Sequence, residues 1–116
     1  MSEPFASCTV GGGAARAVVA PTHAERLCEG HFPGDPLVPG ALLAGLMADV
    51  GTRLLAAEHA VPPVLAEIVQ CAFLAPVRPS DPIVVEARGA ALEVEAEVLA
   101  GGTRAAHAIL RFRDAA

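Results

Sequence analysis

The feature that most constrains the fold of this 116-residue chain is a long apolar segment at residues 41–58. In a helical conformation, apolar residues fall on nearly every face of this segment, and Asp49, Thr52 and Arg53 are the polar exceptions. A helix that is hydrophobic all round has to be buried on all sides. We therefore expect one central helix wrapped by the rest of the chain. Because Asp49 and Arg53 interrupt the segment, it does not indicate a membrane span.

The segments around this helix have the periodicity of β-strands. Residues 92–98 alternate aliphatic side chains with three glutamates, which is typical of a strand with one face in the core and one in water. A Gly101-Gly102 hairpin turn leads into a last strand at residues 103–113. We expect further strands at residues 5–10, 14–20, 64–73 and 83–87. This order of elements indicates an α+β fold, and the length fits a single domain over residues 1–116.

A loop rich in proline and glycine lies directly before the central helix. Residues 31–40, with the sequence HFPGDPLVPG, cannot continue a helix or join a central strand. The loop carries His31, and imidazole is the side chain best suited to moving protons near neutral pH. It also delivers Gly40 to the first helical turn, where unpaired backbone N–H groups can stabilise a developing negative charge. Residues 21–39 show no periodicity, so we expect one long loop that ends in an active site.

The loop resembles the H-F-P-x-x-P-x-x-P-G motif of the 3-hydroxyacyl-acyl-carrier-protein dehydratases of fatty-acid and polyketide synthesis. Every fixed position of the motif is matched, by His31, Phe32, Pro33, Pro36, Pro39 and Gly40. A second segment is similar to the F-x-x-P-V-x-P-x-D turn of the same family, through Phe73, Pro76, Val77, Pro79 and Asp81. Together the two matches cover most of the chain from about residue 20 onward.

The resemblance implies a hotdog fold, in which a curved antiparallel sheet wraps around one central helix and the domain pairs with a second copy. It also implies an active site at the dimer interface, where the histidine of one subunit faces a helix carboxylate of the other. Dehydration of a 3-hydroxyacyl thioester needs a base for the proton next to the carbonyl and a donor for the enolate-like oxygen. We expect His31 to be the base and the Gly40 N–H to be the oxyanion donor. The residues expected to line the substrate site are Phe32, Pro33, Val38, Pro39 and Gly45.

The position that carries the family's carboxylate, five residues after the motif glycine, is occupied here by Gly45. Glycine has no side chain to protonate the leaving hydroxyl, and three alternatives for the acid stay open. Asp49 lies one turn further along the same stripe of the helix, although an ion pair with Arg53 is an alternative role for it. A homologous partner subunit could supply the acid across the interface. His31 could also act alone, taking the proton and returning it to the hydroxyl.

The resemblance therefore predicts a dehydratase-like enzyme that acts on 3-hydroxyacyl thioesters of acyl carrier protein or coenzyme A. Two other functions stay open. One is a non-catalytic or half-site subunit that partners a complete dehydratase. The other is a hotdog acyl thioesterase, although that reaction also usually uses a helix carboxylate, so Gly45 counts against it as well.

Composition narrows the partners and cofactors. The formal net charge of −5 and the absence of lysine argue against nucleic-acid binding. A core of small aliphatic side chains is stabilised further when the surface of another subunit covers it. We therefore expect a homodimer or a heterodimer with a homologous dehydratase subunit. The three cysteines and four histidines have no disulfide or metal-site spacing, so we expect no metal and no cofactor. The N-terminus lacks signal-peptide features, and we expect a cytoplasmic protein that does not contact membranes.

Overall fold

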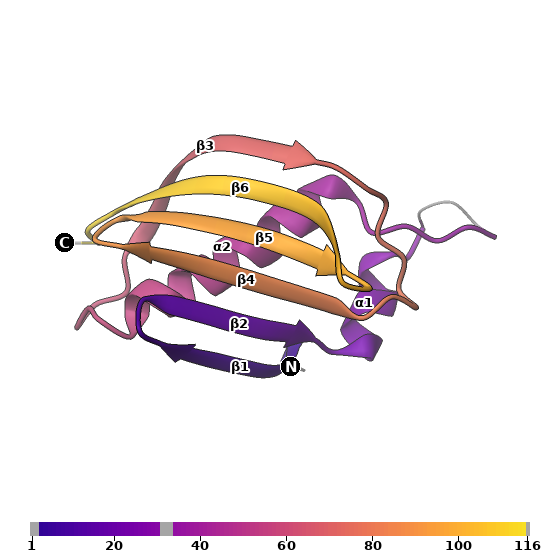
Figure 1. Cartoon of the computed structure of the whole chain (residues 1–116), viewed down its shortest axis with the longest axis horizontal. Helices are drawn as coiled ribbons and strands as arrows, with labels where there is room; N and C mark the ends of the chain where they lie inside the picture. Colours follow the sequence, from indigo (N-terminus) through magenta and orange to yellow (C-terminus); the bar gives the residue numbers. More distant parts are fainter. Residues whose placement is uncertain (1–2, 31–33, 116) are drawn as a thin grey trace.

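A single six-stranded antiparallel sheet curves around one long helix in the computed structural model, which describes residues 3–30 and 34–115 (Figure 1). The order of strands across the sheet is β1-β2-β4-β5-β6-β3. The elements are β1 (Phe5–Gly11), β2 (Ala14–Val19), α1 (Pro21–Leu27), α2 (Gly40–Ala56), β3 (Val64–Phe73), β4 (Ile83–Ala90), β5 (Glu93–Ala100) and β6 (Thr103–Arg113). The predicted strands and the central helix are therefore all present.

Tight glycine turns set the register of two of the hairpins. Gly12 and Gly13 join β1 to β2, and Gly101 and Gly102 join β5 to β6, all with positive φ. Two-residue turns of this kind match the right-handed twist of the flanking strands, and glycine adopts them without steric cost. The turn between β4 and β5 places Ala91 at φ 57°, where glycine would be unstrained.

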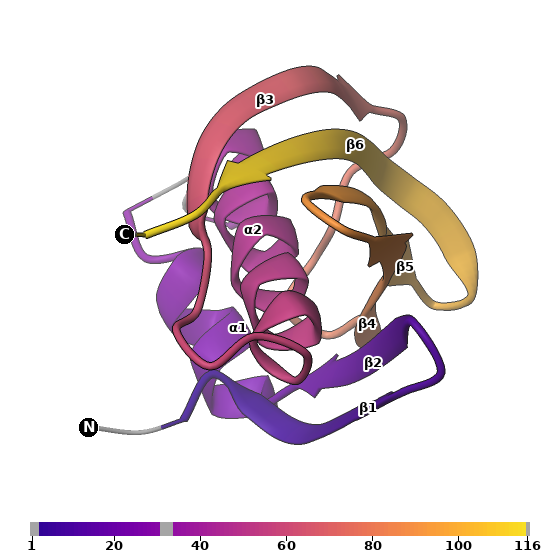
Figure 2. The same cartoon turned by 90° about the vertical axis from the view of Figure 1, so that its left-hand side faces the viewer.

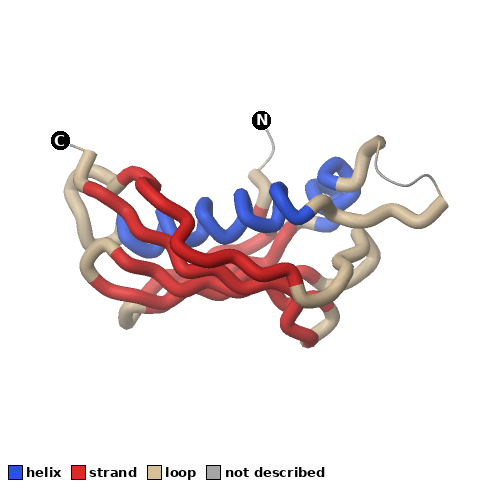
Figure 3. The backbone as a smooth tube through the Cα atoms, turned by 90° about the horizontal axis from the view of Figure 1, so that it is seen from above, coloured by secondary structure: helices blue, strands red, loops and turns tan. Residues whose placement is uncertain are grey.

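The core lies between the concave face of the sheet and α2. Alternate residues of the strands point inward, and the glutamates of β5 point outward, as the period of two predicts. The inward side chains pack against the buried face of the helix, which contributes Leu43, Leu46, Met47, Val50, Leu54 and Leu55. Figure 3 shows α2 lying along one side of the sheet.

The expectation that α2 is buried on all sides is wrong for the single chain. The sheet covers one side of the helix, and the other side remains open between the two edges of the sheet (Figure 2). Leu42 is 39% exposed on this open side, and Ala41 and Gly45 are also exposed. A helix can therefore be apolar all round and still have one face that its own chain leaves uncovered.

The stretch expected as one long loop contains a second helix, α1. This helix has seven residues, begins at Pro21 and buries Ala24. Proline is favoured at the first position of a helix because its missing N–H would have no partner there. One buried residue in two turns is too little to produce a recognisable periodicity, and Pro21 was the available signal.

Strand β3 is one edge of the sheet and pairs with β6 alone among the described strands. Its side chains are exposed along almost the whole strand. The exposed large apolar residues on and next to this edge are Val64, Ile68, Val69, Phe73 and Leu74, each 41–56% accessible. An apolar edge strand with unpaired backbone groups is a template for pairing with another strand.

Candidate active site at the start of the central helix

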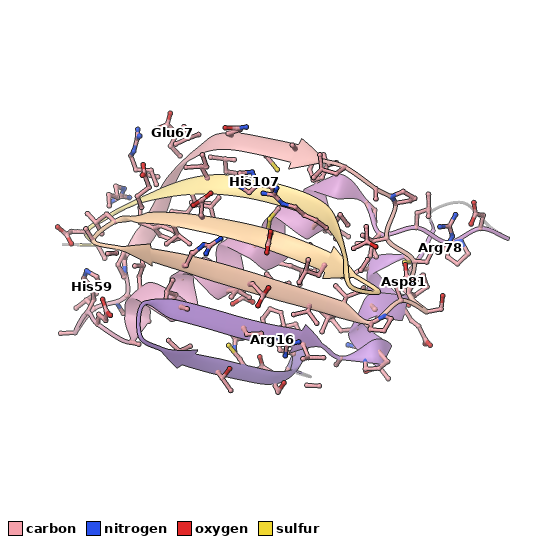
Figure 4. The ribbon with its side chains drawn as sticks, viewed as in Figure 1. Arg16, His59, Glu67, Arg78, Asp81 and His107 are labelled. Atoms are coloured by element: carbon pink, nitrogen blue, oxygen red, sulfur yellow. The ribbon has the colours of Figure 1, made fainter. Side chains whose placement is uncertain are left out.

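The two motif segments found separately in the sequence lie against each other in the structure. The Val38 N–H donates a hydrogen bond to the Val77 carbonyl oxygen at 2.8 Å. The Arg78 guanidinium meets the Asp35 carboxylate at 3.3 Å between Nε and Oδ1. The backbone N–H of Arg78 also donates to Asp81 at 2.9 Å, and Figure 4 shows these two residues together at the end of the molecule where β4 begins. The loop before α2 therefore rests on the turn that follows β3.

The first turn of α2 presents unpaired backbone donors. The N–H groups of Leu42 and Leu43 both donate to the Pro39 carbonyl oxygen, at 3.0 and 3.2 Å. Within residues 3–30 and 34–115, the N–H groups of Gly40 and Ala41 have no hydrogen-bond acceptor, and no side chain caps the helix. Because helix dipoles concentrate positive charge at this end, the two free N–H groups form a suitable place for an anionic oxygen.

Phe73 gives a structural reason for glycine at position 40. A Cβ on Gly40 would stand 3.0 Å from both Cε2 and Cζ of the Phe73 ring, which is closer than ordinary van der Waals contact. The ring and the glycine border a hollow of about 380 Å³ whose other walls are also apolar, including Leu37, Leu43 and Val77. The start of α2 therefore combines free N–H donors with a hydrocarbon-lined space.

The predicted site residues fall into three groups. His31, Phe32 and Pro33 lie outside the described residues, so their roles stay predictions. The structure brings together Val38, Pro39 and Gly40, since Val38 borders the hollow and Pro39 accepts the first hydrogen bonds of α2. Gly45 and Asp49 lie further along the helix, apart from this group. An ideal Cβ on Gly45 has nothing within 4 Å, so the position faces open space in the single chain.

Asp49 forms the ion pair that the sequence offered as its alternative role. Its Oδ1 accepts a hydrogen bond from Arg53 Nε at 2.8 Å. The Arg53 guanidinium also binds Glu3 at 2.6 Å and lies 4.8 Å from the centre of the Phe5 ring. The hydrogen bond that Arg53 donates to Asp49, together with the weaker effect of the one it donates to Glu3, raises the pKa of Arg53 despite its partial burial. The Asp49 carboxylate is therefore engaged in an ion pair within its own chain.

The other polar candidates are engaged elsewhere. His59 Nδ1 lies 2.7 Å from the Leu55 carbonyl oxygen, His107 pairs with Glu95 at 3.3 Å, and Glu67 binds Arg111 at 2.9 Å. Figure 4 shows His59 and Glu67 at the end of the molecule opposite Arg78. Among the described residues, no three of His, Cys, Asp and Glu form a group that could hold a metal ion.

A larger hollow of about 520 Å³, which the sequence did not indicate, lies on the outer face of the sheet. Charged side chains from neighbouring strands line it, and they pair with one another. The pairs are Arg16 with Glu86 at 3.8 Å, Arg104 with Glu97 at 3.1 Å, and His107 with Glu95. This hollow is separated from the start of α2 by the sheet, so it belongs to a different surface from the motif residues.

Neither helix in the described parts of the chain has the length and hydrophobicity needed to cross a bilayer.

The arrangement of one long helix in a curved antiparallel sheet is that of a hotdog fold. Solved structures of three other proteins confirm this architecture at low sequence identity. The chain is thus a hotdog-fold protein with unpaired backbone donors at the start of its central helix.

Residues 11–101 match the family model described as ApeI-like, ApeI dehydratase, and the chain belongs to this family. It is also similar to the 3-hydroxyacyl-[acyl-carrier-protein] dehydratase FabZ of Hydrogenobaculum sp. (strain Y04AAS1), with 39% identity over 69 residues that cover 53% of this chain and 45% of the relative. The FabZ of Pseudothermotoga lettingae is 40% identical over 68 residues, covering 58% of this chain and 49% of that protein. The chain therefore spans about half the length of the curated relatives it matches.

Three solved structures share the fold. The dehydratase heterocomplex ApeI:P from Xenorhabdus doucetiae has a TM-score of 0.76 at 17% identity, covering 97% of this chain and 99% of that one. The (R)-hydratase of A. caviae involved in PHA biosynthesis has a TM-score of 0.67 at 18% identity, with 89% and 95% covered. A thioesterase of Thermus thermophilus, complexed with coenzyme A and Zn, has a TM-score of 0.58 at 21% identity, with 73% and 70% covered.

Proposed function

We propose that this chain is a subunit of a 3-hydroxyacyl thioester dehydratase in fatty-acid or polyketide synthesis, acting on acyl groups carried by acyl carrier protein or coenzyme A. The observation that carries the proposal is the meeting of both motif segments at the start of α2. There the free N–H of Gly40 adjoins an apolar hollow bordered by Phe73 and Val38. A carbonyl oxygen fits the donors and a hydrocarbon chain fits the hollow.

In the proposed reaction, His31 removes the proton from the carbon next to the thioester carbonyl. The Gly40 N–H donates to the carbonyl oxygen as negative charge develops on it. The electron pair of the broken C–H bond then forms the double bond between C2 and C3. The C3–O bond breaks, and the hydroxyl leaves as water after it accepts a proton from an acid.

The acid comes, in this proposal, from a homologous partner subunit that carries a carboxylate at the position matching Gly45. Two observations support a partner rather than Asp49. The Asp49 carboxylate is bound to Arg53, and Gly45 lies on the open side of α2 with nothing within 4 Å of an added Cβ. The first of the solved structures named above is likewise described as a dehydratase heterocomplex.

The edge strand β3 supports the same arrangement. Its unpaired edge borders the open side of α2 (Figure 2), and its exposed apolar residues include Val64, Ile68 and Val69. Pairing with the β3 strand of a second hotdog chain satisfies the free backbone groups and removes these side chains from water. A homodimer and a heterodimer both fit this edge. In a homodimer, however, both copies have glycine at position 45, so neither active site has a carboxylate there.

Complementation between two variants of this chain tests the proposal. The Gly45→Glu variant supplies the acid, and the double variant His31→Ala/Gly45→Glu supplies the acid without the base. Purified proteins are assayed with 3-hydroxybutyryl and 2-butenoyl thioesters by enoyl absorbance, and free-thiol release is measured in parallel. We expect the wild type co-expressed with the double variant to be active, because one site of that pair combines His31 with Glu at position 45.

The controls separate the alternatives. The double variant alone has to be inactive, and Gly45→Glu alone has to be active. Activity of Gly45→Glu without complementation would show that base and acid come from the same subunit. Free-thiol release in place of the enoyl product would identify a thioesterase. Dehydration that survives His31→Ala, or its absence from every combination, would overturn the proposal.

A further inference from the structure

Phe73 occupies an unusual position for a large apolar side chain. It is the last residue of β3, pairs across the sheet with Ala106, and is 53% exposed. Its ring atoms Cε2 and Cζ nevertheless lie against the Cα of Gly40, at 3.0 Å from the place of a Cβ. The ring therefore contributes little to the core and stands instead beside the free N–H at the start of α2.

Gly40 borders the hollow, and its N–H has no acceptor within residues 3–30 and 34–115. Apolar side chains such as Leu37, Leu43 and Val77 form the walls. An acyl thioester has the complementary distribution, with a carbonyl oxygen joined to a hydrocarbon chain. When that oxygen accepts a hydrogen bond from Gly40, the first carbons of the acyl group lie beside Gly40, the residue against which the Phe73 ring packs.

We propose that Phe73 is a specificity-determining residue that selects acyl thioesters without a branch at the carbon next to the carbonyl. This inference rests on the proposed function, because it takes the Gly40 N–H as the donor to the carbonyl oxygen. The ring already touches Gly40, so it has no room to retreat toward the helix when a methyl group is added to that carbon. A single methyl group in an apolar pocket changes recognition by about 10- to 200-fold.

Binding measured without turnover tests this inference. The probes are trans-2-butenoyl-pantetheine and its 2-methyl analogue, titrated into the full chain by calorimetry. We expect the 2-methyl probe to bind the wild type at least tenfold more weakly than the unbranched probe. Phe73→Ala should bring the two dissociation constants to within about threefold, and Phe73→Leu should give an intermediate ratio. Val69→Ala is the matched control, since Val69 is 43% exposed on the same strand but does not border the hollow.

The outcomes are distinct. An unchanged ratio in Phe73→Ala, with the unbranched probe still bound, would overturn the role of Phe73 and leave the proposed function intact. An equal shift in Val69→Ala would also overturn it, because the effect would then come from the edge strand as a whole. Failure of both probes to bind the wild type would overturn the proposed function together with this inference.

Discussion

Replacing Gly45 by alanine is expected to stabilise the protein. Gly45 lies in the interior of α2, with ordinary helical backbone geometry and an exposed position. Glycine costs about 0.8–1.0 kcal/mol relative to alanine in a helix interior, because the unfolded chain loses more conformational freedom. An added Cβ meets no atom within 4 Å, so no packing cost offsets this gain. We expect the free energy of unfolding to rise by about 1 kcal/mol, and the melting temperature by about 4 °C.

A second glycine of the same helix provides the control. A Cβ on Gly51 would stand 3.3 Å from Phe112 and 3.4 Å from both Leu110 and Val94, all in the core. The same helix-propensity gain is then opposed by overpacking, which typically costs about 1–3 kcal/mol. We therefore expect Gly51→Ala to be neutral or destabilising.

Urea denaturation followed by circular dichroism at 222 nm measures both variants, at several protein concentrations so that association is detected. The reasoning is refuted when Gly45→Ala leaves stability unchanged or lowers it while the slope of the transition stays constant. That result would mean that the open side of α2 is already filled at position 45. A concentration-dependent loss of stability would locate the obstruction in a partner copy.

Three further predictions concern single side chains. Asp49→Asn should lower the free energy of unfolding by about 0.3–0.5 kcal/mol, the usual value for a partly exposed i, i+4 ion pair. It should leave the dehydratase activity of the complemented pair unchanged. A large loss of that activity in a folded variant would restore Asp49 as the acid. Ala91→Gly should raise the free energy of unfolding by about 0.5–1 kcal/mol by relieving the positive φ, and a lower melting temperature would contradict this. Burial raises the pKa of the Cys28 thiol above 9.0, so its pH profile of iodoacetamide alkylation should have a higher midpoint in the folded protein than in urea. Since the folded state favours the protonated thiol, this contribution to stability is present below pH 9 and is lost as the pH rises through the folded pKa; equal midpoints would contradict the assignment.

Strand positions were predictable because proline and glycine residues in the sequence mark where strands begin. The strands β3 and β6 have the predicted bounds, since Pro62-Pro63 and Gly101-Gly102 precede them and set where each begins. Helix α2 was predicted to within two residues at either end for a similar reason. The pattern could not show which side of α2 stays uncovered, because that depends on how far the sheet curves around the helix.

The site was predictable in its parts but not in its assembly. The motif identified Gly40 and, from a separate segment, Phe73, but no local pattern indicates that the ring rests on the glycine. That contact depends on the register between β3 and β6 and on the length of the turn after β3. The ion pair between Asp35 and Arg78 likewise joins residues whose proximity only the folded sheet creates. Long-range side-chain contacts of this kind require the topology first.

The helix-propensity cost of Gly45 bears on the proposed pairing with a partner subunit. Within one chain, neither a positive φ nor a close neighbour requires glycine at this position, in contrast to Gly40 and Gly51. The helix is therefore about 1 kcal/mol less stable than it would be with alanine, without a gain in packing. The open side of α2 and the apolar edge of β3 adjoin each other, so one approaching chain can cover both (Figure 2). A side chain at position 45 would project from the open side toward such a chain, and in the proposed heterodimer this chain places none there. When Gly45→Ala stabilises the isolated chain but weakens its association with a carboxylate-bearing partner, the glycine is explained by the interface.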